Sequence, residues 1–233
     1  MATLTTISSG SNGNAYILKC KSETLLIELG VKWKEILLGL DYDISNVVGC
    51  LLSHRHRDHS ESATHALRSN LSVYSCEDVQ AIHMDVKVLK TGLKTRIGGF
   101  VVQPINVEHN VPCYAYIIQH EEFGKLLFVT DCKGFYHLVR DCNHILIECN
   151  WDSDVILDNI INDELSRSLH ENHLEVNQTI ETLRANMTDK LKNIVLLHLS
   201  HNNIKPKATL QKVKTEVGFE NVYIAEKGLI VEL

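Results

Sequence analysis

The stretch Ser53-His54-Arg55-His56-Arg57-Asp58-His59 carries the strongest signal in this sequence. It follows an apolar run at residues 48–52, which predicts a buried strand that ends in a polar loop. Imidazole and carboxylate groups this close together at a strand end are typical of a loop that wraps around zinc, iron or manganese. Chance rarely gives a solvated loop this composition. The stretch therefore predicts a metal centre at the carboxyl end of a strand.

Three further metal donors follow later apolar runs: His109, Asp131 and His198. Taken alone, each is more often a structural residue than a ligand. Taken with the histidine loop, they supply enough imidazoles and carboxylates for two metal ions that share one carboxylate. Because strand ends meet at one edge of an α/β sheet, we expect these residues to converge there. Histidine is also frequent, at 13 of 233 residues, which supports a metal centre.

Short runs of β-branched and aliphatic residues predict strands. We expect strands at residues 3–7, 15–20, 24–28, 47–53, 86–89, 100–107, 114–119, 125–130, 145–148, 193–198, 222–225 and 229–232. Apolar residues at helical spacing predict helices at residues 31–38, 60–68, 77–84, 152–161, 175–187 and 207–217. Strands with helices interspersed predict an α/β protein with two sheets, and because no linker is visible we expect one domain over residues 1–233.

The composition limits where the protein works. The chain is 44% apolar and 22% charged, which suits a globular domain with a sizeable core. No apolar stretch approaches the roughly 20 residues of a membrane-spanning helix, and the first residues lack a secretory signal. The 7 cysteines lack CxxC spacing and lie in or beside apolar runs, which favours reduced, buried thiols. We therefore expect a cytoplasmic protein with no membrane contact.

The charge limits the partners. The formal net charge is −6, and no segment holds a dense cluster of Lys and Arg. Proteins that hold a long polynucleotide usually carry a basic stripe for its phosphates. Long nucleic acid is therefore disfavoured as a partner, and a small substrate is favoured.

The order of the motifs resembles the metallo-β-lactamase superfamily: HxHxDH, then a lone His, then Thr-Asp, then a His that closes a late strand. The resemblance covers nearly the whole chain and implies a four-layer αββα sandwich with its metals at one edge of the two sheets. It implies two divalent metal ions, with zinc expected and manganese as the alternative. The implied ligands are His54, His56 and His109 for the first metal, Asp58, His59 and His198 for the second, and Asp131 as the bridge.

One position departs from the pattern of this superfamily. The early strand-end motif usually contains Asp, whereas this chain has Glu28. In the superfamily that residue supports the histidine loop from behind the ligands, so the contact that Glu28 makes is an open question.

The opening segment Ser8-Ser9-Gly10-Ser11-Asn12-Gly13-Asn14 resembles the SSGSxGN start of a bacterial and phage subgroup of small phosphodiesterase-like proteins. Such a segment has two interpretations. Its backbone N–H groups can form a turn that receives a phosphate, or it is a plain hairpin turn.

A second pair resembles the tRNA 3′-processing endonucleases of the superfamily. Those enzymes carry a Glu after the Thr-Asp strand and a His before a helix, and the positions that match here are Glu148 and His173. A carboxylate raises the pKa of a neighbouring imidazole, which suits a general acid. We predict Asp58, Glu148 and His173 as catalytic residues. The alternative makes His173 a surface residue at a helix entry, and we take His170 and His201 as bystanders.

Within the superfamily the chain resembles the anti-Pycsar phosphodiesterases of phages and bacteria. The resemblance implies metal-dependent hydrolysis of small cyclic nucleotide signals such as cyclic CMP or UMP, by a hydroxide shared between two metals, with a role in phage counter-defence. It also implies a homodimer, for which residues 151–173 are the expected contact segment.

Two alternatives remain open. The chain shares most of the same features with the YycJ-like proteins. The runner-up is therefore a nuclease that acts on DNA or RNA, either of the YycJ type or like the tRNA-processing enzymes. The other is a thioester hydrolase of glyoxalase type, since the same scaffold supports that reaction.

Overall fold

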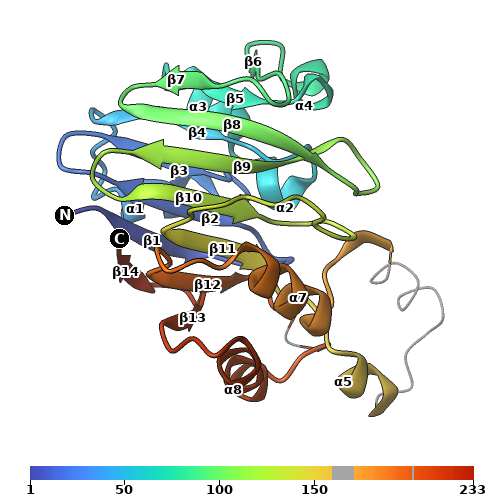
Figure 1. The fold of residues 1–233 in the computed structure, drawn as a ribbon. Helices are drawn as coiled ribbons and strands as arrows, with labels where there is room; N and C mark the ends of the chain where they lie inside the picture. The colour runs from blue at the N-terminus through green and yellow to red at the C-terminus, as the bar shows by residue number, and fades with distance from the viewer. Residues whose placement is uncertain (159–170, 201) are drawn as a thin grey trace.

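The computed structural model describes residues 1–158, 171–200 and 202–233. In these residues two seven-stranded mixed sheets lie face to face, as Figure 1 shows. The first sheet has the order β14 (Ile230–Glu232), β1 (Thr3–Ser8), β2 (Ala15–Lys19), β3 (Thr24–Ile27), β4 (Val47–Leu51), β5 (Val73–Ser75) and β6 (Lys87–Val88). The second has the order β13 (Val222–Ile224), β12 (Asn193–Leu197), β11 (His144–Glu148), β10 (Gly124–Val129), β9 (Cys113–His120), β8 (Phe100–Val107) and β7 (Thr95–Ile97).

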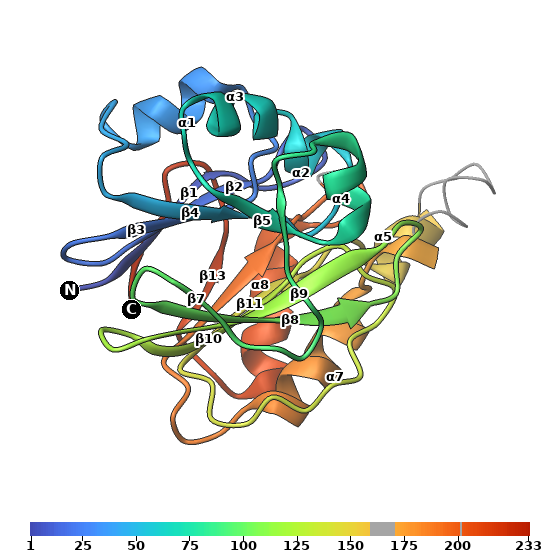
Figure 2. The same ribbon diagram turned by 90° about the horizontal axis from the view of Figure 1, so that it is seen from above.

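Helices cover the outer face of each sheet (Figure 2). Over the first sheet lie α1 (Trp33–Gly39), α2 (Arg57–Ser60), α3 (Ala63–Arg68) and α4 (Glu77–Ile82). Beside the second sheet lie α5 (Ser153–Asp158), α7 (Val176–Asn186) and α8 (Pro206–Val217). The expected four-layer αββα sandwich is therefore confirmed. Within the part of the chain described, no helix has the length and apolar character needed to span a membrane.

Burial on both faces explains why the sequence of strand β10 is a continuous apolar run. Leu126 and Phe128 point into the core between the two sheets. Leu127 and Val129 point the other way, into the core under α7 and α8. A strand that is buried on both faces needs apolar side chains at every position, and each such side chain stabilises the fold by about 1.5–3 kcal/mol.

Several expected elements differ in detail from the structure. The helix expected at residues 60–68 is two helices, α2 and α3, because the histidine loop itself forms the first turn. The strands β5 and β7 were not expected, since each is three residues long and mixes polar with apolar side chains. The helix expected at residues 152–161 is described as α5 up to Asp158, and its remainder lies outside the described residues.

Parallel pairing positions the functional residues. Strands β3, β4, β5 and β6 pair in parallel in one sheet, and β10, β11, β12 and β13 do so in the other. Their carboxyl ends therefore lie at one edge of the sandwich. The residues at or just after these ends are Glu28, Ser53, Asp131, Glu148 and His198.

Candidate metal centre

The first cluster at this edge consists of His54, His56 and His109. The Nε2 atom of His54 lies 2.9 Å from Nδ1 of His56, and that atom lies 3.3 Å from Nε2 of His109. Burial lowers the pKa of all three imidazoles, which keeps them neutral. Neutral imidazoles whose nitrogens converge are typical zinc ligands. The structure thus brings together the three residues that the sequence predicts for the first metal.

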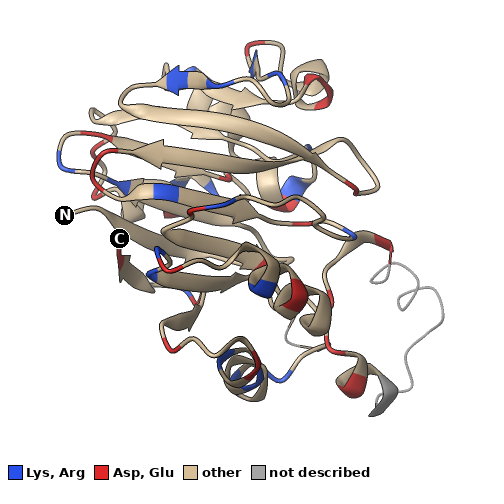
Figure 3. Cartoon of the chain, viewed as in Figure 1, with Lys and Arg blue, Asp and Glu red and all other residues tan. Residues whose placement is uncertain are grey.

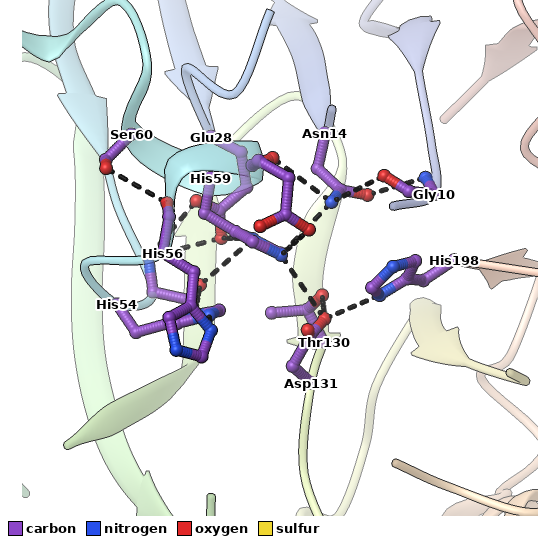
Figure 4. Close-up of polar contacts among 12 residues, drawn as sticks. Gly10, Asn14, Glu28, His54, His56, His59, Ser60, Thr130, Asp131 and His198 are labelled. Carbon is purple, nitrogen blue, oxygen red and sulfur yellow. Dashed lines mark hydrogen bonds and ion pairs between the residues drawn. The ribbon is translucent and has the colours of Figure 1, made fainter. Parts of the chain in front are cut away.

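Asp131 lies between this cluster and a second one (Figure 4). Its Oδ1 atom is 2.7 Å from Nδ1 of His198 and 3.4 Å from Nε2 of His59. Donor atoms of Asp131, Glu148, His173 and His198 all lie within 4.8 Å of one another, and those of His54, His59 and Asp131 do so as well. This central position is the one that the sequence predicts for a bridging carboxylate.

Asp58 lies at the margin of the second cluster. One of its carboxylate oxygens is 3.5 Å from Nε2 of His59. In the described residues the donors nearest to Asp131 and His198 include Glu148 and His173, which the sequence predicts as catalytic residues rather than ligands. The structure therefore places the predicted catalytic pair directly beside the predicted second ligand set.

The charges at the site favour a cation. Burial alone lowers the pKa of His198, but the carboxylates of Asp131 and Glu148 outweigh it and raise this pKa to about 10. His59 behaves in the same way: burial is opposed by Asp131 and Glu28, and its pKa rises well above the ordinary value. Positive charge thus stabilises the buried carboxylates, and either protons on the imidazoles or divalent cations can supply it.

An unpaired nitrogen gives an independent test of whether metal fits. Nε2 of His198 is buried and has no hydrogen-bond partner in the described chain. A buried imidazole nitrogen without a partner is costly, because it has lost its hydrogen bond to water. A metal ion coordinated by that nitrogen removes the cost. The donor set and this orphaned atom both fit a bound divalent cation.

Glu28, which stands where the superfamily usually has Asp, still contacts the histidine loop. Its Oε1 atom accepts a hydrogen bond from the Ser53 N–H at 3.1 Å and lies 3.5 Å from Nδ1 of His59. Ser53 Oγ in turn lies 2.8 Å from Nδ1 of His54. Glu28 is fully buried and has a left-handed backbone with φ of 61°. The longer side chain therefore still reaches the histidine loop and orients two of its imidazoles.

The opening segment supports the site from the other side. Ser9 Oγ accepts a hydrogen bond from the backbone N–H of His198 at 2.8 Å. Asn14 Nδ2 lies 3.1 Å from Nε2 of His59 and donates to the carbonyl of Asp58 at 3.2 Å. The N–H groups of Gly10 and Gly13 already donate within the loop, to Asn14 Oδ1 and to the Gly10 carbonyl. These two groups are thus committed to the turn rather than presented to a phosphate.

The positioning roles of Ser9 and Asn14 were not predicted from the sequence. The SSGSxGN motif marked the segment, but only the fold brings it against His59 and His198. Gly30 belongs to the same arrangement, since a Cβ there would collide with the carbonyl oxygen of Asp58.

Glu148 and His173 form a close pair. Nδ1 of His173 lies 2.6 Å from Oε1 of Glu148, and the other Glu148 oxygen accepts from the N–H groups of Cys132 and Leu174. Burial lowers the pKa of His173, but the Glu148 carboxylate outweighs it, and the net shift is upward. The His173 side chain is 19% exposed, so its ring can reach a bound molecule. His170 and His201, taken from the sequence as bystanders, lie outside the described part of the chain.

A cavity of about 720 Å³ opens beside the first cluster. His109 lines it, and Nδ1–H of this residue donates to the Asn172 carbonyl at 3.1 Å. That bond leaves Nε2 of His109 as the nitrogen free to bind metal. Charged residues at the cavity are Glu108, Lys133 and Glu171.

Comparison with known proteins places these features in a fold family. No family model matches the chain. It is 25% identical over 238 aligned residues to the exodeoxyribonuclease YycJ of Bacillus anthracis, covering 91% of this chain and 89% of the relative. Its structure is similar to the metallo-β-lactamase fold protein YhfI of Bacillus subtilis, with a TM-score of 0.78, 18% identity and complete coverage of both chains. It is also similar to a diphosphatase of the PhnP family, with a TM-score of 0.73, 14% identity and coverage of 100% and 97%.

The chain therefore has the metallo-β-lactamase fold, and its resemblance to YycJ-like proteins is confirmed. This fold implies divalent metals, and the His and Asp clusters at the strand ends are able to hold them.

Proposed function

We propose that this protein is a metal-dependent hydrolase that cleaves phosphodiesters. The observation that carries the proposal is the Glu148–His173 pair, whose ring nitrogen and carboxylate are 2.6 Å apart beside the metal-binding clusters. Two divalent ions, with zinc expected, would be held by the clusters around Asp131, where they would activate water and neutralise charge on a phosphate. The names of an exodeoxyribonuclease relative and a diphosphatase neighbour support phosphate ester chemistry.

His173 has the features of a proton donor. Because Glu148 Oε1 accepts the proton on Nδ1, the opposite nitrogen of the protonated ring carries a second proton to give. Glu148 stabilises that protonated form, since its own carboxylate is completely buried and satisfied by backbone N–H groups. The alkoxide that leaves a phosphodiester needs such a proton, because it is a strong base.

The charges around the site favour a small diester such as a cyclic nucleotide. Lys and Arg are interspersed with Asp and Glu over the ribbon (Figure 3). The two arginines of the histidine loop are already paired, Arg55 with Asp78 at 2.9 Å and Arg57 with Glu61 at 3.4 Å. The cavity beside His109 has the size of a pocket for a small molecule, and its charged residues do not form a basic track.

The second candidate is an exodeoxyribonuclease. The observation that favours it is the 25% identity to YycJ over 91% of the chain. An exonuclease acts at a chain end, so it needs fewer phosphate contacts than a protein that binds along a polymer. The phage counter-defence role stays a prediction.

Two assays test the proposal. Bis-p-nitrophenyl phosphate and S-lactoylglutathione separate a phosphodiesterase from a thioester hydrolase, and we expect turnover of the phosphate ester alone. Cyclic mononucleotides and single-stranded DNA then separate the two substrate classes. We expect cleavage of the cyclic nucleotides with a weak dependence on salt, since few phosphates are contacted. Cleavage of DNA alone, with a steep loss of activity in salt, would select the exonuclease.

A further inference from the structure

A second group of metal-binding side chains lies at the opposite end of the sandwich. Cys20 directly follows β2, His120 ends β9, and Glu122 lies in the turn between β9 and β10. In the register, His120 pairs with Gly124 at the start of β10, whereas Asp131 lies beyond its far end. A six-residue strand spans about 20 Å. Figure 1 shows the β9–β10 turn at the end of the strands away from α2, so this group is separate from the metal centre.

The donor atoms of this group converge. One donor atom each from Cys20, His120 and Glu122 lies within 4.8 Å of the others. The Cys20 Sγ atom is 3.3 Å from Nδ1 of His120, and a tetrahedral zinc site places sulfur and nitrogen ligands roughly 3.5 Å apart. Cys20 is 2% exposed and His120 8% exposed, whereas the Glu122 side chain is 19% exposed, so two of the three donors are buried and the third lies at the surface.

Glu23 prepares His120 as a ligand. Its Oε1 atom lies 3.1 Å from Nε2 of His120, and a carboxylate oxygen can only accept, so the imidazole carries its proton on Nε2. The lone pair is then on Nδ1, which faces Cys20. A carboxylate that holds the far nitrogen of a histidine in this way is the usual support of a metal-binding imidazole.

An unpaired carboxylate oxygen distinguishes a cation site from a simple hydrogen-bond cluster. In the cluster alternative, Nδ1 of His120 accepts from the Cys20 thiol and from the Glu122 N–H, which is 3.2 Å away. That alternative leaves Oε2 of Glu122 buried with no hydrogen-bond partner among the described residues, and its one ion pair there, to the N-terminal ammonium, is long at 3.8 Å. Burial and the carboxylates of Glu122 and Glu23 also raise the pKa of Cys20 to about 12. The carboxylates beside Cys20 therefore outweigh the N-terminal ammonium in their effect on its thiol, which favours a bound cation.

We propose that Cys20, His120 and Glu122 bind a further zinc ion, with Glu23 as the residue that positions His120. On binding, the Cys20 thiol gives its proton to solvent and coordinates as the thiolate. Because β2 belongs to the first sheet and β9 to the second, the ion would join the two sheets at the end remote from the metal centre. Its role is structural, and the inference does not depend on the proposed function.

Cobalt substitution of the full-length protein tests this site directly. A Co²⁺ ion bound to a thiolate gives a sulfur-to-cobalt charge-transfer band in the near ultraviolet, and the ligands proposed for the metal centre contain no sulfur. We expect the band in the unmodified protein, together with one more bound zinc per chain than the metal centre holds. We expect Cys20→Ser to abolish the band and remove one zinc, with hydrolysis of bis-p-nitrophenyl phosphate unchanged.

The matched control is Cys113→Ser, since the Cys113 thiol lies 3.6 Å from His54 beside the metal centre. The band should survive in that variant. Glu122→Gln provides a second variant of nearly the same shape, in which we expect weaker zinc binding and an unchanged fold by circular dichroism. Absence of the band in the unmodified protein, or its survival in Cys20→Ser, would overturn the proposal.

Discussion

At the scale of single residues, the pair Glu148 and His173 makes the sharpest prediction about activity. If His173 protonates the leaving group, His173→Ala lowers kcat on a cyclic nucleotide by about 10²–10⁴, the usual effect of a positioned acid. The loss is smaller on bis-p-nitrophenyl phosphate, because nitrophenolate leaves without a proton. Glu148→Gln shows the same pattern more mildly, since Glu148 orients the ring and stabilises its charge. Steady-state kinetics on both substrates measure the difference.

Metal content is the control for this pair. Zinc per chain in His173→Ala should match the unmodified protein, which separates loss of the acid from loss of metal. Equal losses of kcat on the two substrates would contradict the acid role and leave His173 as a residue that positions the substrate or stabilises the helix entry.

The burial of His144 leads to a prediction of how the unfolding free energy changes as the pH falls. This residue begins β11, is completely buried, and accepts a hydrogen bond from Asn193 Nδ2 at 3.1 Å. Burial, with a smaller effect of Lys192, lowers its pKa from 6.5 to about 4. The pKa of His144 is lower in the folded protein than in the unfolded chain. The contribution of His144 to the unfolding free energy is therefore fully present above its unfolded pKa, and it is lost as the pH falls through its folded pKa.

The matching variant is His144→Asn, whose side-chain oxygen can still accept from Asn193. Between about pH 7.5 and about pH 5, the unmodified protein should lose about 2 kcal/mol more unfolding free energy than the variant. Urea titrations at the two pH values measure this difference. Equal losses in both proteins would show that His144 does not titrate below its ordinary range.

At the scale of elements, the opening segment should control metal affinity through the histidine loop. Asn14 is fully buried and contacts both the Asp58 carbonyl and His59. Asn14→Ala removes this support, and we expect metal affinity to fall by about 10–100-fold. Competition with a chromogenic chelator measures it. Asn12→Ala, in the same segment but exposed, is the control and should bind metal normally.

The sequence predicted the elements whose physics is local. Continuous apolar runs such as β10 and β12 predicted strands that are buried on both faces, and the polar residues after these runs predicted the site. Short strands such as β5 and β7 contain no continuous apolar run that predicts a strand. They form because they pair with neighbouring strands. The contacts of Ser9 and Asn14 with the metal centre depend on tertiary packing between distant segments, which no local pattern encodes.

At the scale of the whole molecule, we expect a homodimer. This expectation comes from the resemblance to the anti-Pycsar phosphodiesterases, and residues 159–170 of the contact segment predicted at 151–173 lie outside the described residues. Light scattering at micromolar concentration should give twice the mass of the 26.3 kDa chain. A fully active monomer would contradict the prediction.

The central claim is that metal held around Asp131 drives phosphodiester hydrolysis. The most direct measurement is the rate of bis-p-nitrophenyl phosphate hydrolysis by the protein before chelator dialysis, after it, and after zinc is returned. We expect the rate to be lost on dialysis and restored by zinc in the unmodified protein, whereas Asp131→Ala stays inactive because it lacks the carboxylate between the two clusters. A dialysed protein that retains its full rate without metal, or an Asp131→Ala variant with normal activity, would contradict the account.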